Sequence, residues 1–247
     1  MHRELSALNI KIFADGADLA EMARLARDPL IQGLTTNPTL MRKAGVTSYR
    51  AFARQVLDAV PDLPVSFEVL SDDVDRMAAE ARVIGSWSDN VYVKIPITNT
   101  AGESTLRIVE ELSWDGIKLN VTAITTLDQA FGAARHLTSG TPAVVSVFAG
   151  RIADTGRDPV PMMEAVAGAL EGTPAVELLW ASPRELLNIF HAEDAGCHII
   201  TVTGDLLAKR HLVGKDLAEF SLDTVRMVFG DAAGVDLALD LAATGSR

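Results

Sequence analysis

The stretch "VYVKIPI", residues 91 to 97, has the pattern of a buried β-strand that carries one charge. Valine and isoleucine alternate with Tyr92 and Lys94, so the two sets of side chains point to opposite faces of the strand. Pro96 lacks a backbone N–H and therefore ends the regular strand pairing. We predict a strand with one apolar face and with Lys94 on the opposite face.

Seven other stretches along the chain share this β-rich composition. They are "IKIFAD" (10–15), "IQGLTT" (31–36), "VSFEVL" (65–70), "IKLNVT" (117–122), "AVVSVF" (143–148), "VELLWAS" (176–182) and "HIITVT" (198–203). Segments whose apolar residues recur with a helical period lie between these stretches. One β-rich stretch and the helical segment after it repeat roughly every 20 to 35 residues, as a βα unit requires. Eight such units in one chain predict an α/β fold, specifically a (β/α)₈ TIM barrel. An open doubly wound sheet is the alternative, which we disfavour because no G-x-G-x-x-G motif follows the first strand.

The chain has no Pro-, Gly- or Ser-rich linker, so we predict a single barrel domain over residues 1–247. Within it, residues 206–247 are expected to form the last barrel helix and extra C-terminal helices. Two helical sequences lie there, "DLLAKRHL" (205–212) and "SLDTVRMVFGDAAGVDLALDL" (221–241). The second is longer than barrel closure requires, so it would cap the barrel or contact another subunit. We expect a homo-oligomer.

Composition narrows the possible partners. Hydrophobic residues make up 48% and charged residues 22% of the 247, as is typical of a globular enzyme, and the net charge is -11. An acidic chain argues against nucleic acid and anionic membranes as partners, and an anionic small substrate would need locally placed arginines. The single cysteine, Cys197, suits a reducing compartment. No stretch approaches about 18 apolar residues, so we expect a cytoplasmic protein without membrane spans.

Counting alternate residues assigns each strand an interior face, which lines the active site near the C-terminal end of a barrel. The interior positions are Lys11, Phe13, Asp15, Gly33, Thr35, Asn37, Ser66, Glu68, Tyr92, Lys94, Lys118, Asn120, Thr122, Val144, Ser146, Phe148, Trp180, Ser182, Thr201 and Thr203, and every strand ends with a polar residue on this face. Such a polar interior is costly to desolvate unless its groups bond one another or a ligand, so it indicates a binding site. For any single Ser or Thr, hydrogen bonding to loop backbone is the alternative.

The pair Lys94 and Glu68 indicates a specific chemistry, because two opposite charges inside adjacent strands are rarely structural. A lysine amine is normally protonated, but enclosure in a low-dielectric interior favours the neutral form, which can attack a carbonyl and form an imine. Aldol chemistry on that imine also needs carboxylates that move protons, and Asp15 and Glu68 are available. Lys11 and Lys118 are rival nucleophiles, although each lies earlier in its strand.

A metal-dependent mechanism would require several His or carboxylate ligands at strand ends. Of the five histidines, only His198 touches a predicted strand, and it lies at the beginning of that strand. We therefore predict no metal and no other cofactor.

Seven motifs in this order resemble those of the transaldolases, particularly the short type that includes the fructose-6-phosphate aldolases. The motifs are "FADGAD", "GLTTNPTL", "VSFEVL", "VYVKIPIT", "GIKLNVTAI", "SVFAGRIAD" and "WASPREL". The resemblance extends from about residue 10 to about residue 205, which is nearly the whole predicted barrel.

The resemblance implies a role for each matching position. Lys94 would form the Schiff base, Asp15 would be the acid/base for the C4 hydroxyl and the acceptor aldehyde, and Glu68 would act with Thr122 through a bound water. The implied substrate-binding residues are Thr35, Asn37, Asn120, Ser146, Phe148, Arg151, Ser182 and Arg184, of which the two arginines would bind phosphate.

The resemblance also implies which reaction occurs. Phe148 and Glu68 match the transaldolases, whereas the fructose-6-phosphate aldolases have tyrosine and glutamine at these positions. This predicts transfer of a dihydroxyacetone unit from fructose 6-phosphate or sedoheptulose 7-phosphate to an aldose phosphate. A lyase that releases free dihydroxyacetone, and a catalytically silent sugar-phosphate-binding protein, are the alternatives. Gly16 and Pro183 depart from the residues usual in the family.

Overall fold

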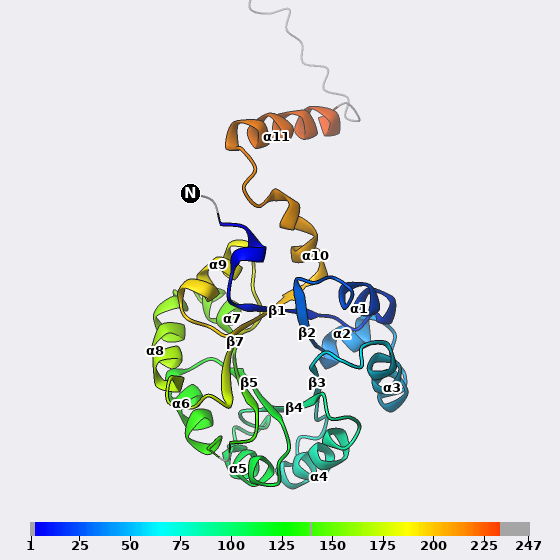
Figure 1. The fold of residues 1–247 in the computed structure, drawn as a ribbon, viewed down its shortest axis with the longest axis vertical. Coiled ribbons are helices and arrows are strands. Elements are labelled where there is room, and N and C mark those ends of the chain that lie inside the picture. Colours follow the sequence, from blue (N-terminus) through cyan, green and yellow to red (C-terminus); the bar gives the residue numbers. More distant parts are fainter. Residues whose placement is uncertain (1–2, 139, 233–247) are drawn as a thin grey trace, which may run out of the picture.

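Eight parallel strands form a closed barrel in the order of the sequence, in a computed structural model that describes residues 3–138 and 140–232 (Figure 1). This confirms the predicted (β/α)₈ TIM barrel. Neighbouring strands pair in the order β1 to β8, and β8 closes on β1. The strands are β1 (Lys11–Asp15), β2 (Ile31–Thr35), β3 (Val65–Glu68), β4 (Val91–Pro96), β5 (Leu119–Ile124), β6 (Ala143–Val147), β7 (Val176–Trp180) and β8 (Ile199–Thr203).

Helices surround the barrel (Figure 1). Side chains that cap their first turns fix where several of these helices begin. Asp73 accepts a hydrogen bond from the N–H of Arg76 at the start of α4, and Thr126 and Gln129 form a reciprocal capping box at α6. The helices around the barrel are α1 (Leu19–Leu25), α2 (Pro38–Lys43), α3 (Tyr49–Ala59), α4 (Val74–Gly85), α5 (Leu106–Trp114), α6 (Leu127–His136), α7 (Ala149–Ala153), α8 (Val160–Leu170) and α9 (Leu187–Asp194).

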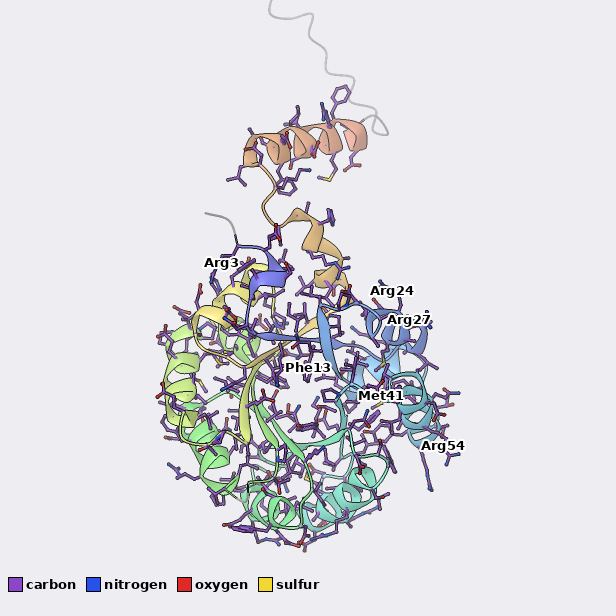
Figure 2. The ribbon with its side chains drawn as sticks, viewed as in Figure 1. Arg3, Phe13, Arg24, Arg27, Met41 and Arg54 are labelled. Atoms are coloured by element: carbon purple, nitrogen blue, oxygen red, sulfur yellow. The ribbon has the colours of Figure 1, made fainter. Side chains whose placement is uncertain are left out.

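Two apolar layers hold the barrel together. The larger lies between the outer faces of the strands and the helices, and the smaller fills the barrel interior. The interior layer contains Phe13, which Figure 2 labels, together with Val144, Leu179, Ala181 and Ile199. A Cβ atom at Gly33 would lie 2.4 Å from the Phe13 ring, so the ring occupies the space that a side chain on β2 would need. The interior is therefore packed with side chains below the C-terminal ends of the strands.

The interior face of β7 differs from the prediction. Leu179 and Ala181 belong to the interior layer, whereas Trp180 is 1% exposed and packs in the outer layer against the helices. The prediction that Trp180 shares the interior face was wrong because consecutive apolar residues in this strand leave its alternation ambiguous. The polar interior residue of β7 is Glu177, which forms an ion pair with Lys11 at 2.8 Å.

After β8 the chain leaves the barrel wall. The predicted helix over 205–212 is a short α10 (Gly204–Leu207) followed by a 3₁₀ turn (Ala208–Leu212). The next helix, α11 (Leu217–Ala232), projects away from the barrel and so does not cap it (Figure 1). The rest of its predicted sequence, 233–241, lies outside the described residues. Among the residues that the structure describes, no helix is both long enough and apolar enough to span a membrane.

Candidate active site

A cavity of about 1130 Å³ opens at the C-terminal ends of the strands. Every residue that the sequence predicts to be catalytic or substrate-binding lines this cavity, and these residues lie on strands β1 to β7 or in the segments that follow them. The lining includes Asp15, Thr35, Asn37, Glu68, Lys94, Asn120, Thr122, Ser146, Phe148, Arg151, Ser182 and Arg184. The fold thus brings together residues that are up to 169 positions apart, from Asp15 to Arg184.

Lys94 lies at the centre of this group and is only 6% exposed. Its register on β4 places it opposite Glu68 of β3 and Asn120 of β5. The Lys94 Nζ lies 3.1 Å from Glu68 Oε2 and donates a hydrogen bond to the backbone oxygen of Thr36 at 2.9 Å. The amine is therefore held in a fixed position by one carboxylate and one carbonyl.

Asp15 ends β1 and is partly buried in the same cavity. Thr35 Oγ1 donates to Asp15 Oδ1 at 2.8 Å, and Asn37 Nδ2 donates to Asp15 Oδ2 at 3.2 Å. Burial raises the pKa of the Asp15 carboxyl, and the positive charge of Lys94 and these two hydrogen bonds only partly offset that rise. A carboxyl group with a raised pKa is suited to exchanging a proton with a substrate.

Asn37 also determines where α2 begins. Its Oδ1 accepts a hydrogen bond from the N–H of Leu40, and Pro38 occupies the first helical position. The same side chain therefore caps a helix with its oxygen and contacts Asp15 with its nitrogen, so the start of α2 positions the Asp15 carboxylate.

On β5, two buried oxygens lack hydrogen-bond partners among the described residues. Asn120 donates from Nδ2 to Ser66 Oγ at 3.1 Å, but its Oδ1 has no donor. Thr122 Oγ1 is also buried without a partner. Both residues line the cavity beside Lys94. Buried polar atoms normally have partners, so this pair is suited to binding a water molecule or the hydroxyl groups of a ligand.

The β6 side of the cavity contributes one small polar and one aromatic residue. Ser146 is buried, and Phe148 packs partly on the interior apolar layer. The N–H of Phe148 donates to the carbonyl of Ile124 at 2.7 Å, which fixes the backbone where β6 ends. Phe148 is thus an apolar part of the cavity wall, with no hydroxyl group to offer.

Two arginines line the cavity after β6 and β7, in addition to Lys43 and Lys209 elsewhere in its wall. Arg151 is on α7, and Arg184 follows Ser182, whose φ of 58° is in the left-handed region. The two segments lie so close together that a Cβ at Gly150 would be 1.6 Å from the Ser182 carbonyl oxygen. Arg184 donates from Nε to Asp154 Oδ1 at 2.9 Å and also pairs with Asp154 through Nη2.

The rival lysines lie elsewhere, as their earlier strand positions suggested. Lys11 pairs with Glu177, and Lys118 donates to the carbonyl of Asp89, with its amine 5.8 Å from the centre of the Tyr92 ring. Neither lines the cavity. Within residues 3–138 and 140–232, no group of three or more His, Cys, Asp or Glu side chains could hold a metal ion.

Three groups that support the site were not predicted from the sequence. Tyr49, at the start of α3, donates from its hydroxyl to the Glu68 carbonyl at 2.8 Å, and the Thr36 carbonyl binds Lys94. Neither contact has a signature in the sequence, because each joins different elements. Asp154 lies three residues after Arg151 in "GRIAD", but its hydrogen-bond partner is Arg184, 30 residues away, so the sequence spacing does not indicate the pair.

The model of the Transaldolase/Fructose-6-phosphate aldolase family matches residues 12–244 of the chain. The chain belongs to this family. The resemblance that seven short motifs indicated is therefore confirmed, and the transaldolase/aldolase family is one of enzymes.

Relatives with curated names agree with this membership. "Probable transaldolase 2" of Listeria monocytogenes is 36% identical over 204 residues, which cover 81% of this chain and 88% of the relative. A "Probable transaldolase" of Streptococcus agalactiae is 36% identical over 78% of this chain and 86% of its own length. Another, from Dehalococcoides mccartyi, is 32% identical over 87% of this chain and 97% of its own length.

The likeness to solved structures concerns the fold alone. A structure described as that of a candidate phosphonomutase from Burkholderia cenocepacia superimposes with a TM-score of 0.54 at 14% identity. The match covers 93% of this chain and 96% of that chain.

Proposed function

We propose that this member of the transaldolase/fructose-6-phosphate aldolase family is a transaldolase. It transfers a dihydroxyacetone unit from fructose 6-phosphate or sedoheptulose 7-phosphate to an aldose phosphate, through a Schiff base on Lys94. The observation that carries the proposal is the buried Lys94 amine, which contacts Glu68 in a cavity that also holds Asp15.

The reaction begins when the neutral Lys94 amine attacks the donor carbonyl and the resulting carbinolamine loses water to give the imine. Glu68, 3.1 Å from the Lys94 Nζ, exchanges protons in this step with the help of a water molecule bound at Thr122. Asp15 then removes the proton of the C4 hydroxyl, the C3–C4 bond breaks, and an aldose phosphate leaves.

The electrons of that bond remain on the lysine-bound fragment as an enamine. The enamine attacks the aldehyde of a second aldose phosphate, and Asp15 returns its proton to the new hydroxyl group. Hydrolysis of the imine releases the product ketose. The unpaired oxygens of Asn120 and Thr122 support this assignment, since hydroxyl groups of the bound fragment can satisfy them.

Arg151 and Arg184 are proposed to bind the phosphate. Both line the cavity, and they supply local positive charge in a chain whose net charge is -11. Thr35, Asn37, Ser146 and Ser182 complete the polar wall around the sugar.

Borohydride reduction in the presence of fructose 6-phosphate tests the Schiff base. We expect a stable adduct of a three-carbon unit on Lys94, identified by peptide mass spectrometry, and no adduct in a Lys94→Met variant. Lys11→Arg and Lys118→Arg are matched controls, because both rival lysines lie outside the cavity, and each should still form the adduct. An adduct on either of these lysines, or none on Lys94, would refute the mechanism.

A second assay separates transfer from release. With fructose 6-phosphate and no acceptor, a transaldolase releases little free dihydroxyacetone, whereas adding an aldose phosphate acceptor produces a new ketose phosphate. Release without acceptor at a rate that rivals transfer would instead identify a lyase. The half-buried Phe148 supports transfer, because it offers no hydroxyl group that would activate water.

We further propose that the protein is a homo-oligomer in the cytoplasm. The support for an oligomer is the exposed apolar surface of α11, where Leu217 and Phe229 are 80% and 79% exposed. A single cysteine supports a reducing compartment.

A further inference from the structure

The guanidinium group of Arg184 is held from one side. Asp154 accepts hydrogen bonds from Nε and from Nη2, one on each carboxylate oxygen, which is the side-on, two-pronged geometry of a strong arginine–carboxylate pair. This contact lowers the pKa of the Asp154 carboxyl, so the carboxylate is charged at neutral pH. Both side chains remain nearly half exposed, at 43% and 45%.

The backbone that carries this pair is also fixed. The N–H groups of Arg184 and Glu185 both donate to Asn188 Oδ1, at 2.8 and 3.1 Å. On the other side, Gly150 packs against the Ser182 carbonyl, so the two segments that carry Arg151 and Arg184 are locked together. The Arg184 side chain is therefore anchored at its backbone and at one edge of its planar head.

The other edge of the same guanidinium group is available. Arg184 Nη1 makes no hydrogen bond with any described residue, and a guanidinium group can offer its two terminal nitrogens as a second two-pronged edge. Arg151, whose charge also acts on Asp154, lies on the same side of the cavity and has no ion pair among the described residues. Two arginines thus share one carboxylate and retain a net positive charge.

We infer that Asp154 is a positioning residue for phosphate recognition. It holds Arg184 by the Nε edge and turns the free edge toward the substrate phosphate, which Arg151 binds from its other side. Asp154 thereby increases the preference of the enzyme for phosphorylated over unphosphorylated sugars, although it contacts neither kind of sugar itself. The inference rests on the proposed function, because it assumes that the phosphate lies at these arginines.

The test compares a phosphorylated ligand with one that lacks phosphate, in wild type and in Asp154→Asn. The first measurement is the KM for fructose 6-phosphate in the transfer assay. The second is the dihydroxyacetone concentration that half-saturates borohydride trapping on Lys94. Losing the two-pronged contact should raise the KM about tenfold, with kcat changed by about twofold at most and with dihydroxyacetone trapping unaltered.

Asp158→Asn is the matched control. It removes the same charge from the nearby segment between α7 and α8, but Asp158 contacts the N–H of Val160 and makes no hydrogen bond with Arg184. Its KM for fructose 6-phosphate should equal that of wild type.

Each other outcome overturns the inference. A lower KM in Asp154→Asn would mean that Asp154 competes with phosphate for Arg184. Equal losses with both ligands would mean that Asp154 only maintains the loop structure, and an unchanged KM would mean that it has no role. Failure of the proposed function gives a distinct result, because borohydride would then trap neither fructose 6-phosphate nor dihydroxyacetone on Lys94 of the wild-type protein.

Discussion

At the scale of single residues, the carboxyl group of Asp15 is held between opposing influences. Burial favours its neutral form, whereas Lys94, Thr35 and Asn37 favour the carboxylate, and the balance leaves the pKa raised. The proposed cleavage needs the carboxylate as a base, so activity should fall as pH drops through this pKa. The acidic limb of the pH profile thus reports on the hydrogen bonds that Asp15 accepts.

Thr35→Val removes the donor 2.8 Å from Asp15 Oδ1. Because a hydrogen bond to the carboxylate stabilises the charged form, its loss raises the Asp15 pKa further and should move the acidic limb of kcat/KM to higher pH. At the pH optimum, kcat/KM of Thr35→Val should fall by about tenfold or less. Thr35→Ser keeps the hydroxyl and should restore the wild-type limb. An acidic limb that shifts to lower pH, or does not move in Thr35→Val, would exclude Asp15 as the titrating base.

At the scale of elements, the register of the strands explains why much of the site could be predicted. In β3, β4 and β5, one face is apolar and the other polar, so alternation alone predicted that Glu68, Lys94 and Asn120 point inward. The same reasoning failed in β7, where apolar residues are consecutive and Trp180 faces the helices. Alternation specifies a face only where the two faces differ in chemistry.

Contacts between side chains on different helices and strands could not be predicted from the sequence, for a different reason. The pair Asp154 and Arg184 joins positions 30 residues apart, and Tyr49 reaches the Glu68 carbonyl from another helix. No periodicity relates such positions, because the closure of the barrel brings them together. The family resemblance assigned residues that would touch the substrate, whereas these supporting residues required the three-dimensional structure.

Gly150→Ala tests the close approach of α7 to the segment after β7. A methyl group there would lie 1.6 Å from the Ser182 carbonyl oxygen, so the backbone must shift, and we expect a loss of about 3 kcal/mol in the free energy of unfolding. The same shift should raise the KM for fructose 6-phosphate, because it displaces Arg184 from Arg151.

Gly168→Ala is the control, since Gly168 lies inside α8 with no atom within 4 Å of its Cβ position. There we expect a gain of about 0.5–1 kcal/mol and unchanged kinetics. Denaturant unfolding measures both variants, and equal stabilities would show that the segments can separate freely.

At the scale of the whole molecule, α11 stands apart from the barrel and has no buried residue (Figure 1). Its apolar side chains are largely exposed, including Leu217, Val225, Val228 and Phe229. An amphipathic helix gains most of its stability from packing its apolar face, so an isolated α11 is poorly stable. We expect the barrel or the α11 of a second copy to cover this surface.

Light scattering tests that expectation directly. The wild-type protein should have a mass that is a multiple of 26.4 kDa, and the double variant Val225→Asp with Phe229→Asp should shift toward the single-chain mass. Thr224→Asp, which adds charge on the same helix while keeping its apolar residues, should leave the assembly intact. A wild-type mass of one chain would contradict the oligomer.

The unpaired oxygens of Asn120 and Thr122 have a consequence for how this sequence can change. Replacing Thr122 with valine, which has a similar shape, would remove a buried oxygen that lacks a partner and so would stabilise the empty protein, whereas an apolar residue at position 120 would also remove the hydrogen bond to Ser66. Selection for stability alone would therefore favour valine at position 122. Under the proposed function, the polar identity of Thr122 trades thermodynamic stability for affinity for the substrate.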